Sequence, residues 1–240
     1  MTYILLANKI TFTVHGREMP ILHETTLGIN SGEFIVVLGH NGSGKSSLVQ
    51  ILSGERAPSS GEVLLSGGPL NKTNRSVIAQ DIVTLAQKAE ERLFIDLTLE
   101  ENVILWESRF NERERLGFDK IMKLTHSPKR FLPRAQELVR NFSGGEKQLI
   151  LLGLALAHPP KVLFLDEHTA SLDPKASNEI MKATNNAILR HQITAIMVTH
   201  RLEDALKYGT RLIVMNEGKI VIDQLKSDNL SKQHLQDMME

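Results

Sequence analysis

The sequence predicts an α/β fold organised around a buried parallel sheet. Short apolar runs of strand length, such as residues 33–38 and 162–165, alternate with stretches that have the spacing of helices. A glycine-rich loop follows the first of these runs and leads directly into a helical pattern. From about residue 90 to residue 160 the pattern is helical throughout, which predicts a helical insertion in an otherwise alternating chain.

The composition limits the classes of function. The chain has 240 residues, of which 41% are hydrophobic, enough for one large domain with its own core. Its 28 basic and 28 acidic residues leave no net charge, so the overall basic footprint of a nucleic-acid-binding protein is missing and no such partner is expected. The absence of cysteine excludes disulfides and thiolate chemistry and fits a reducing cytoplasm.

Two segments bear on a membrane role. Residues 1–9 lack the basic leader and long apolar segment of a signal peptide. The longest strongly apolar run, residues 149–157, is far shorter than the roughly 20 residues that a membrane helix needs. Any membrane role is therefore expected to depend on a partner.

The loop from Gly39 to Ser46 has the spacing G-x-x-x-x-G-K-S of a Walker A phosphate-binding loop. It lies between a predicted strand and a predicted helix, so backbone N–H groups and the positive end of the helix dipole would surround an anion. Lys45 is expected to reach the β- and γ-phosphates of a nucleoside triphosphate, and the Ser46 hydroxyl to bind Mg²⁺. The residues predicted to bind the nucleotide here are Gly39, His40, Asn41, Gly42, Ser43, Gly44, Lys45, Ser46 and Ser47.

Short strands and turns are predicted before the helical insertion. Residues 10–14 alternate as a strand does, and His15–Glu18 is expected to turn the chain. Residues 61–65 and 81–86 are predicted as further strands, the second of which ends at Gln87.

The helical insertion begins with a recognisable start signal. Thr98 and Glu101 form a capping-box pattern ahead of a helix that contains Trp106. Two stretches rich in charged and turn residues, 107–115 and 125–134, are predicted as surface connections within the insertion.

Strand and helix alternate again after Pro160. Residues 162–165 and 194–198 are predicted as buried parallel strands, and the helix between them is expected to begin near Pro174, behind Asp173. Residues 211–215 and 219–222 are predicted to form a terminal hairpin across a turn.

Asp166 and Glu167 follow four apolar residues and together form a Walker B pattern. At the carboxyl end of a strand, Asp166 would face the metal, and Glu167 is the natural group to orient the attacking water. A pair of acidic residues at a strand end is otherwise often a solvated surface feature. The Walker A loop upstream favours the catalytic interpretation.

Gln87 and His200 are candidates because of their positions after predicted strands. Gln87 could meet the metal or the water while its loop links two parts of the chain. His200 ends the strand that begins at Thr194. A single glutamine or histidine at such a place is more often structural or capping, so both assignments depend on this placement.

Ser143, Gly144 and Gly145 open another predicted helix, which continues through Gln148 and Leu156. A serine N-cap followed by two glycines offers free N–H groups, and so a second anion site. If both sites contact one nucleotide, the simplest geometry is two copies of the chain facing head-to-tail.

This ordered set of motifs resembles the ATP-binding subunit of ABC (ATP-binding cassette) transporters, over about residues 4–223. The resemblance implies a P-loop NTPase with a RecA-like α/β core, an antiparallel β subdomain and an α-helical subdomain. The expected organisation is one ABC ATP-binding domain over residues 1–240. Its expected parts are a catalytic core with the β subdomain at 1–88 and 161–223, the helical subdomain with the signature motif at 89–160, and a C-terminal helical tail at 224–240.

The resemblance also implies the cofactors ATP and Mg²⁺ and a role for each matching residue. Ser46, Gln87 and Asp166 would bind the metal, and Glu167, His200 and Gln87 would be catalytic. Asp173 would belong to a segment that spans the dimer, the D-loop. Ser143, Gly144 and Gly145 would bind the γ-phosphate held by the second copy.

The chain departs from the family pattern at three places. In the signature, Phe142 and Glu146 replace the usual leucine and glutamine, and His168 stands where proline is usual. The aromatic residue that normally stacks on adenine falls near Val14, while Phe12 is expected to point into the core.

The runs at residues 166–174, 197–200 and 203–209 are similar to a bacterial branch associated with amino-acid uptake. In that branch the subunit accompanies a separate permease and a substrate-binding lipoprotein, with tryptophan or tyrosine as the solute. The implied function is an ATPase that forms a homodimer on ATP and drives solute import, at the cytoplasmic face of the cell membrane. The alternative is a soluble ABC ATPase of a non-transport assembly pathway.

Overall fold

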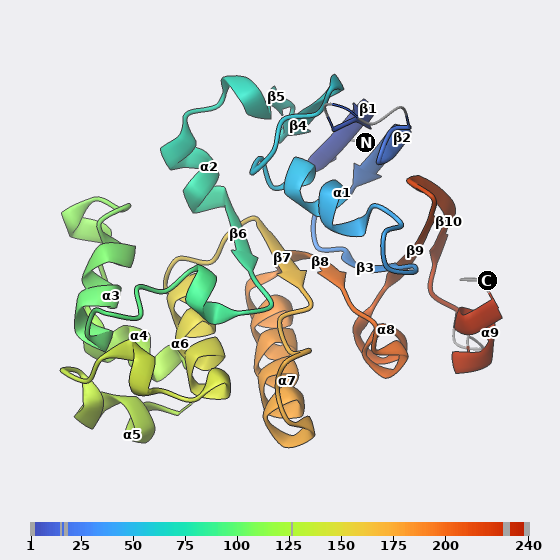
Figure 1. The fold of residues 1–240 in the computed structure, drawn as a ribbon. Coiled ribbons are helices and arrows are strands. Elements are labelled where there is room, and N and C mark those ends of the chain that lie inside the picture. The colour runs from blue at the N-terminus through green and yellow to red at the C-terminus, as the bar shows by residue number, and fades with distance from the viewer. Residues whose placement is uncertain (1–2, 15, 17–18, 126, 228–230, 238–240) are drawn as a thin grey trace.

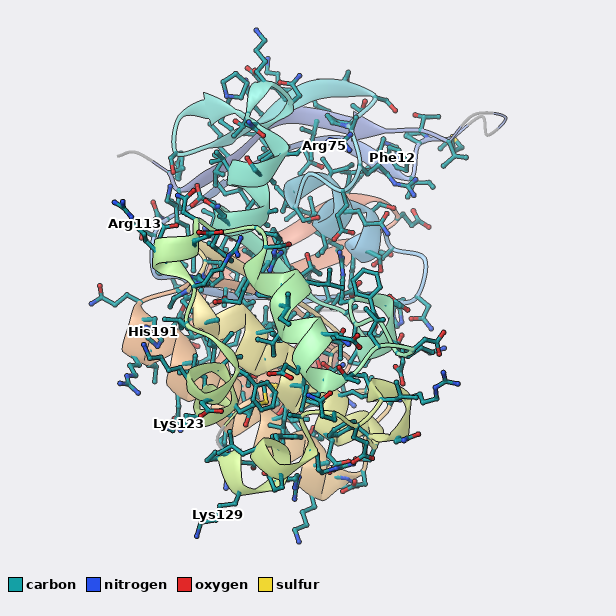
Figure 2. The ribbon with its side chains drawn as sticks, turned by 90° about the vertical axis from the view of Figure 1, so that its left-hand side faces the viewer. Phe12, Arg75, Arg113, Lys123, Lys129 and His191 are labelled. Atoms are coloured by element: carbon teal, nitrogen blue, oxygen red, sulfur yellow. The ribbon has the colours of Figure 1, made fainter. Side chains whose placement is uncertain are left out.

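Two sheets of different kinds share one helix between them (Figure 1). The computed structural model describes residues 3–14, 16, 19–125, 127–227 and 231–237. The helical part and the smaller sheet lie at opposite ends of the molecule, with Lys129 at one end and Phe12 toward the other (Figure 2).

The larger sheet has six strands in the order β10-β9-β3-β8-β7-β6. The five strands from β9 to β6 run parallel, and β10 pairs antiparallel with β9 at the edge. Their bounds are β3 Phe34–Leu38, β6 Ile82–Leu85, β7 Val162–Asp166, β8 Thr194–Val198, β9 Arg211–Asn216 and β10 Lys219–Leu225.

The smaller sheet is antiparallel, in the order β2-β1-β4-β5. Its strands are β1 Leu5–Phe12, β2 Leu22–Ile29, β4 Ser60–Leu65 and β5 Gly68–Pro69. Helix α1 (Lys45–Leu52) packs between this sheet and one face of the larger sheet.

The other helices lie outside the layer that contains α1. They are α2 Arg75–Asp81, α3 Leu99–Glu107, α4 Phe118–Leu124, α5 Pro128–Phe131, α6 Gly144–Ala157, α7 Pro174–His191, α8 Leu202–Tyr208 and α9 Lys232–Asp237. Single 3₁₀ turns occur at Leu70–Lys72, Ala89–Glu91, Glu112–Glu114, Leu132–Arg134 and Val139–Asn141.

The buried strands divide their side chains between two cores. On β3, Ile35 and Val37 join the core around α1, whereas Phe34, Val36 and Leu38 face the core that contains α6 and α7. This division follows from the period-two alternation of a strand that is buried on both faces. The sheet is therefore held rigidly from both sides, and its carboxyl edge can carry the functional loops.

The structure confirms most of the predicted elements. The predicted strands at 33–38, 61–65, 81–86, 162–165 and 194–198, the capping box of Thr98 with Glu101, the helix start at Pro174 and the terminal hairpin are all present. The predicted strand at 10–14 is misplaced, because the strand runs from Leu5 to Phe12 and stops before Val14. The predicted turn at 15–18 lies outside the described residues except for Gly16.

Two further predictions differ from the structure in detail. The stretches 107–115 and 125–134 contain short helices rather than plain connections. Strand β10 continues to Leu225, past the predicted start of the tail. Within the described part of the tail, helix α9 covers Lys232–Asp237.

No helix in the described part of the chain combines the length and the apolar character needed to cross a bilayer.

Candidate functional site

The carboxyl edge of the parallel sheet gathers four predicted segments. Because β3, β8, β7 and β6 are neighbours in that order, their following residues line up along one edge: the Walker A loop, His200, Asp166 with Glu167, and Gln87. Ligands of open α/β sheets bind at such an edge. The structure thus brings together residues that are far apart in the sequence.

The Walker A loop is shaped by glycines in conformations that other residues avoid. Gly39 has φ 142°, and a Cβ placed on it would lie 2.2 Å from the Met215 carbonyl oxygen of β9. Gly42 and Gly44 also have positive φ, and a Cβ on Gly42 would meet nothing within 4 Å. The loop is therefore packed tightly on the β9 side and open at Gly42, where a phosphate could approach the backbone.

Lys45 crosses the inside of this loop. Its Nζ donates to the carbonyl oxygens of Gly39 and His40, each at 2.8 Å. Burial lowers the pKa of Lys45, against the opposing effect of the negative Glu167 and Asp166 nearby. The ammonium group is thus held between the loop and the two carboxylates.

The remaining loop residues differ in exposure. His40, Asn41, Gly42 and Ser46 are exposed, Ser47 is half-buried, and Ser43 and Gly44 are buried. The Ser43 carbonyl accepts a hydrogen bond from Gly218 N–H at 3.0 Å, which ties the loop to the β9–β10 turn. The Ser43 hydroxyl has no hydrogen-bond partner among the described residues.

Asp166 lies in a concentration of negative charge. Burial raises its pKa, and the carboxylates of Glu167, Glu55 and Glu91 raise it further, while Lys45 acts in the opposite direction. A divalent cation would be the electrostatic complement of this cluster. Mg²⁺ is typically held by one or two carboxylates together with water and substrate phosphates. The donors on this edge fit that pattern, and no group of three His, Cys, Asp or Glu among the described residues forms a metal site by itself.

Glu167 is held in an unusual conformation beside His200. Its φ is +47°, in the left-handed region, and its N–H donates to the Val198 carbonyl of β8 at 3.0 Å. Its Oε1 lies 2.5 Å from the Nε2 of His200. A strained residue fixed in this way is typical of functional sites.

Gln87 follows β6 with its side chain exposed. Its carbonyl oxygen accepts from the Gln148 side-chain amide at 3.2 Å and from the Ser171 hydroxyl at 3.4 Å. Gln148 is buried in α6 and also donates to Ala86 at 2.9 Å. Gln148 therefore bridges the segment after β6 to the helix that starts at the signature, a link that sequence reasoning missed because its partners are 61 and 62 residues away.

The signature residues lie on a separate surface. Ser143 caps α6 in a full capping box with Glu146, and Ser143 and Gly144 are exposed. They border an open hollow of about 410 Å³ that is also lined by Ser171, Leu172 and Asp173. No residue of the Walker A loop is among the described residues that line this hollow.

The three departures from the family pattern have different surroundings. Phe12 is buried under the Arg56 guanidinium, 4.9 Å from the ring centroid, as predicted, whereas Val14 is exposed. His168 is buried, burial lowers its pKa to about 4, and its Nε2 has no partner among the described residues. Glu146 pairs with Arg134, with 2.7 Å between Oε1 and Nη1.

This fold and the Walker A loop define a P-loop nucleotide-binding protein. The chain belongs to the ABC transporter family, whose pattern matches residues 22–170. It is an ATP-binding subunit and an ATPase of that family.

Several known proteins are similar to this chain over most of its length. A tyrosine transport ATP-binding protein of Clostridioides difficile (strain R20291) is 32% identical over 237 residues, 94% of this chain and 93% of that protein. An energy-coupling factor transporter ATP-binding protein of Acetivibrio thermocellus is 32% identical over 207 residues, 85% of this chain and 72% of that protein. A solved ATP-binding cassette, a dimer in a post-hydrolysis state bound to ADP and Pi, has a TM-score of 0.79 and 25% identity and covers 93% of this chain and 99% of its own.

Proposed function

We propose that this ATPase works as a head-to-tail homodimer that drives a separate membrane permease. The observation that carries the proposal is the separation of the two anion-binding helix starts. Gly44–Lys45 lies at the sheet edge, whereas Ser143 lies on a hollow to which the Walker A loop does not contribute. Two copies facing each other would place the signature of one chain over the Walker A loop of the other. One of the similar solved structures is a dimeric cassette, which supports the dimeric state.

In the proposed site, the Walker A loop and Lys45 bind the phosphates of ATP, and Glu167 orients the attacking water and accepts the proton that this water loses. The water oxygen bonds to the γ-phosphorus as the bond from that phosphorus to the bridging oxygen breaks, and ADP leaves. His200, 2.5 Å from Glu167, keeps that carboxylate in position. Ser143, Gly144 and Gly145 hold the γ-phosphate from the second copy.

Ser46, Asp166 and Gln87 would hold Mg²⁺ in this site. The exposed hydroxyl of Ser46 lies at the start of α1, and the Asp166 carboxylate lies at the end of β7. When bound, the metal would neutralise charge that develops on the β- and γ-phosphates. Its positive charge would also relieve the repulsion among the carboxylates around Asp166.

The membrane partner is expected to dock on the helical part. Four apolar side chains are exposed there: Phe94, Ile95, Ile104 and Leu105, which we call the insert patch. Phe94 is fixed beside the start of α3 by two hydrogen bonds. Its N–H donates to Oδ1 of Asn102 at 2.8 Å, and its carbonyl oxygen accepts from Nδ2 of Asn102 at 2.9 Å. Large apolar side chains exposed on one part of a protein favour protein contact.

The solute and the direction of transport are the finer parts of the proposal. We infer that the solute is an amino acid, as the name of the Clostridioides difficile relative and the runs at 166–174, 197–200 and 203–209 suggest. Import as the direction is inferred from the runs alone. The proposal that a substrate-binding protein belongs to the same system rests on those runs alone. A peripheral location on the cytoplasmic face of the membrane follows from docking to a permease.

Co-purification from the native membrane tests the proposal. The chain should be isolated with a polytopic membrane protein, and Phe94→Glu should reduce its recovery severalfold. Leu189→Glu is the matched control, because Leu189 on α7 is 69% exposed and Phe94 is 60% exposed. A stable complex with soluble proteins only would reject the transporter assignment in favour of an assembly ATPase.

A further inference from the structure

The start of α6 carries a negative charge at the place where a phosphate is expected. In the capping box, Ser143 N–H donates to Oε2 of Glu146 at 2.8 Å, and Glu146 N–H donates to the Ser143 hydroxyl oxygen at 3.3 Å. Gly144 and Gly145 are the first two residues of the helix, so their N–H groups have no acceptor within it. Those two groups and the hydroxyl hydrogen of Ser143 are left to meet an anion, beside the Glu146 carboxylate.

Arg134 neutralises this carboxylate. Its Nη1 donates to the second oxygen of Glu146, Oε1, at 2.7 Å. Burial alone would raise the pKa of Glu146, but the hydrogen bond from Ser143 and the pairing with Arg134 outweigh that effect and lower it. Glu146 is therefore ionised at neutral pH, and Arg134 is its counter-charge.

The Arg134 guanidinium is held from three directions. Its Nε and Nη2 donate to both oxygens of Glu137, at 2.6 and 3.0 Å, and its Cζ lies over the Phe142 ring, 3.8 Å from the ring centroid. Phe142 directly precedes Ser143, so the stacking also fixes the approach of the chain to the helix. The arginine is thus built into the signature rather than resting on the surface.

The rest of the hollow does not supply a surplus of positive charge. Arg130 and Lys175 line it, but so do Asp173 and Glu179 in addition to Glu146. Without Arg134, the Glu146 carboxylate beside the helix start would have no paired cation and would repel a phosphate.

We propose that Arg134 is a positioning residue for the ATP bound by the second copy of the chain: by pairing with Glu146, it keeps the start of α6 attractive to the γ-phosphate. This inference rests on the proposed head-to-tail dimer. The inference also explains what changes when Glu146 stands in place of the usual glutamine of the family. Glutamine would complete the same capping box without a charge, whereas glutamate needs a positively charged partner.

A double-mutant cycle tests the inference. All variants carry Glu167→Gln so that ATP-bound dimers accumulate, and the dimer dissociation constant is measured with ATP by analytical ultracentrifugation. Arg134→Ala should weaken the dimer about tenfold, because it leaves Glu146 unpaired beside the phosphate. Glu146→Gln should tighten it by a few-fold, and the double variant should return close to the parent.

The pairing with Glu137 provides the matched control. Arg134→Ala combined with Glu137→Gln should remain as weak as Arg134→Ala, since Glu137 shares the guanidinium but does not cap α6. The unfolding temperature without nucleotide shows whether each variant is folded. The defect of Arg134→Ala should also shrink at high salt, as a repulsion between charges does.

The outcomes separate this inference from the dimer on which it rests. If the parent forms no dimer with ATP, both are wrong. If the parent dimerises but Arg134→Ala has no effect, or if Glu146→Gln fails to rescue it, then the arginine only supports the fold and this inference alone is wrong.

Discussion

The two helix starts proposed to bind phosphate in this chain are built in different ways. The one at Gly44–Lys45 is shaped by backbone strain and by a buried lysine that the loop itself holds. The one at Ser143–Gly144 is exposed and is organised by a capping box and an ion pair between side chains. The first depends on geometry that few substitutions can preserve, whereas the second depends on a charge balance that substitutions can adjust.

The largest effect is expected at the site that contains the buried helix start at Gly44–Lys45. Glu167→Gln should lower steady-state ATP hydrolysis by about 10²–10⁴-fold, the range for loss of a general base, while an ATP-bound dimer accumulates. Phosphate release and size-exclusion chromatography with ATP measure both results. Glu91→Gln is the control, since Glu91 also raises the pKa of Asp166 but does not pair with His200. Retained hydrolysis in Glu167→Gln would reject this carboxylate as the key group.

Mixing two inactive variants tests whether the two helix starts serve one site. Lys45→Ala disables the buried start, and Gly144→Asp adds a negative charge to the exposed one, where a Cβ meets only Leu172 at an ordinary 3.4 Å. Each variant alone should lose ATP hydrolysis by about 100-fold or more.

An equimolar mixture of the two should recover activity, at most about a quarter of the wild-type rate. Half of the dimers formed at random are mixed, and each mixed dimer has one intact site of two. A phosphate-release assay over a range of mixing ratios measures the recovery. If the mixture is as inactive as its components, each chain completes its own site and the head-to-tail arrangement is wrong.

The free energy of unfolding should also depend on pH, through the buried His168. Its pKa is lowered to about 4 by burial, below the ordinary value of 6.5, so the unfolded chain binds the extra proton first. Above about pH 6.5 this group therefore does not lower the free energy of unfolding, and as the pH falls from 6.5 toward 4 that free energy decreases.

Between pH 7 and pH 5 this loss should reach about 2 kcal/mol of unfolding free energy, and His168→Gln should abolish it. Urea unfolding of both proteins at each pH measures the difference. Equal pH dependence in the two proteins would show that His168 is not the titrating group.

The smallest expected effect concerns the adenine end of the nucleotide. Val14→Tyr should increase ATP affinity by up to about tenfold, because an aromatic ring there could stack on the base. A titration that follows ATP binding measures it. Val77→Tyr is the control, at a valine of similar exposure on α2. No gain in affinity would mean that Val14 does not face adenine.

The sequence was sufficient to predict that several site residues lie at the carboxyl ends of buried parallel strands, although it did not predict the order of those strands in the sheet. Residues such as Asp166 and His200 directly follow short apolar strands, and parallel strands bring their carboxyl ends to one edge. Local signals such as Asp173 before Pro174 gave the start of α7 correctly.

The missed features depend on contacts between distant residues. Strand β2 and helix α2 were not predicted, and Val14 was placed in a strand that ends at Phe12. The pairing of Arg134 with Glu146 and the bonds from Gln148 to Ala86 and Gln87 have no local pattern, since the folded chain alone brings these groups together.

The buried amide of Gln148 has one more consequence, for the efficiency of the machine. Together with the ion pair between Lys147 and Glu90, it joins the segment after β6 directly to α6. Without this link, the segment that carries Gln87 would be held less firmly against the helix that starts at the signature. The expected fault is weaker coupling, with less solute moved for each ATP that is hydrolysed.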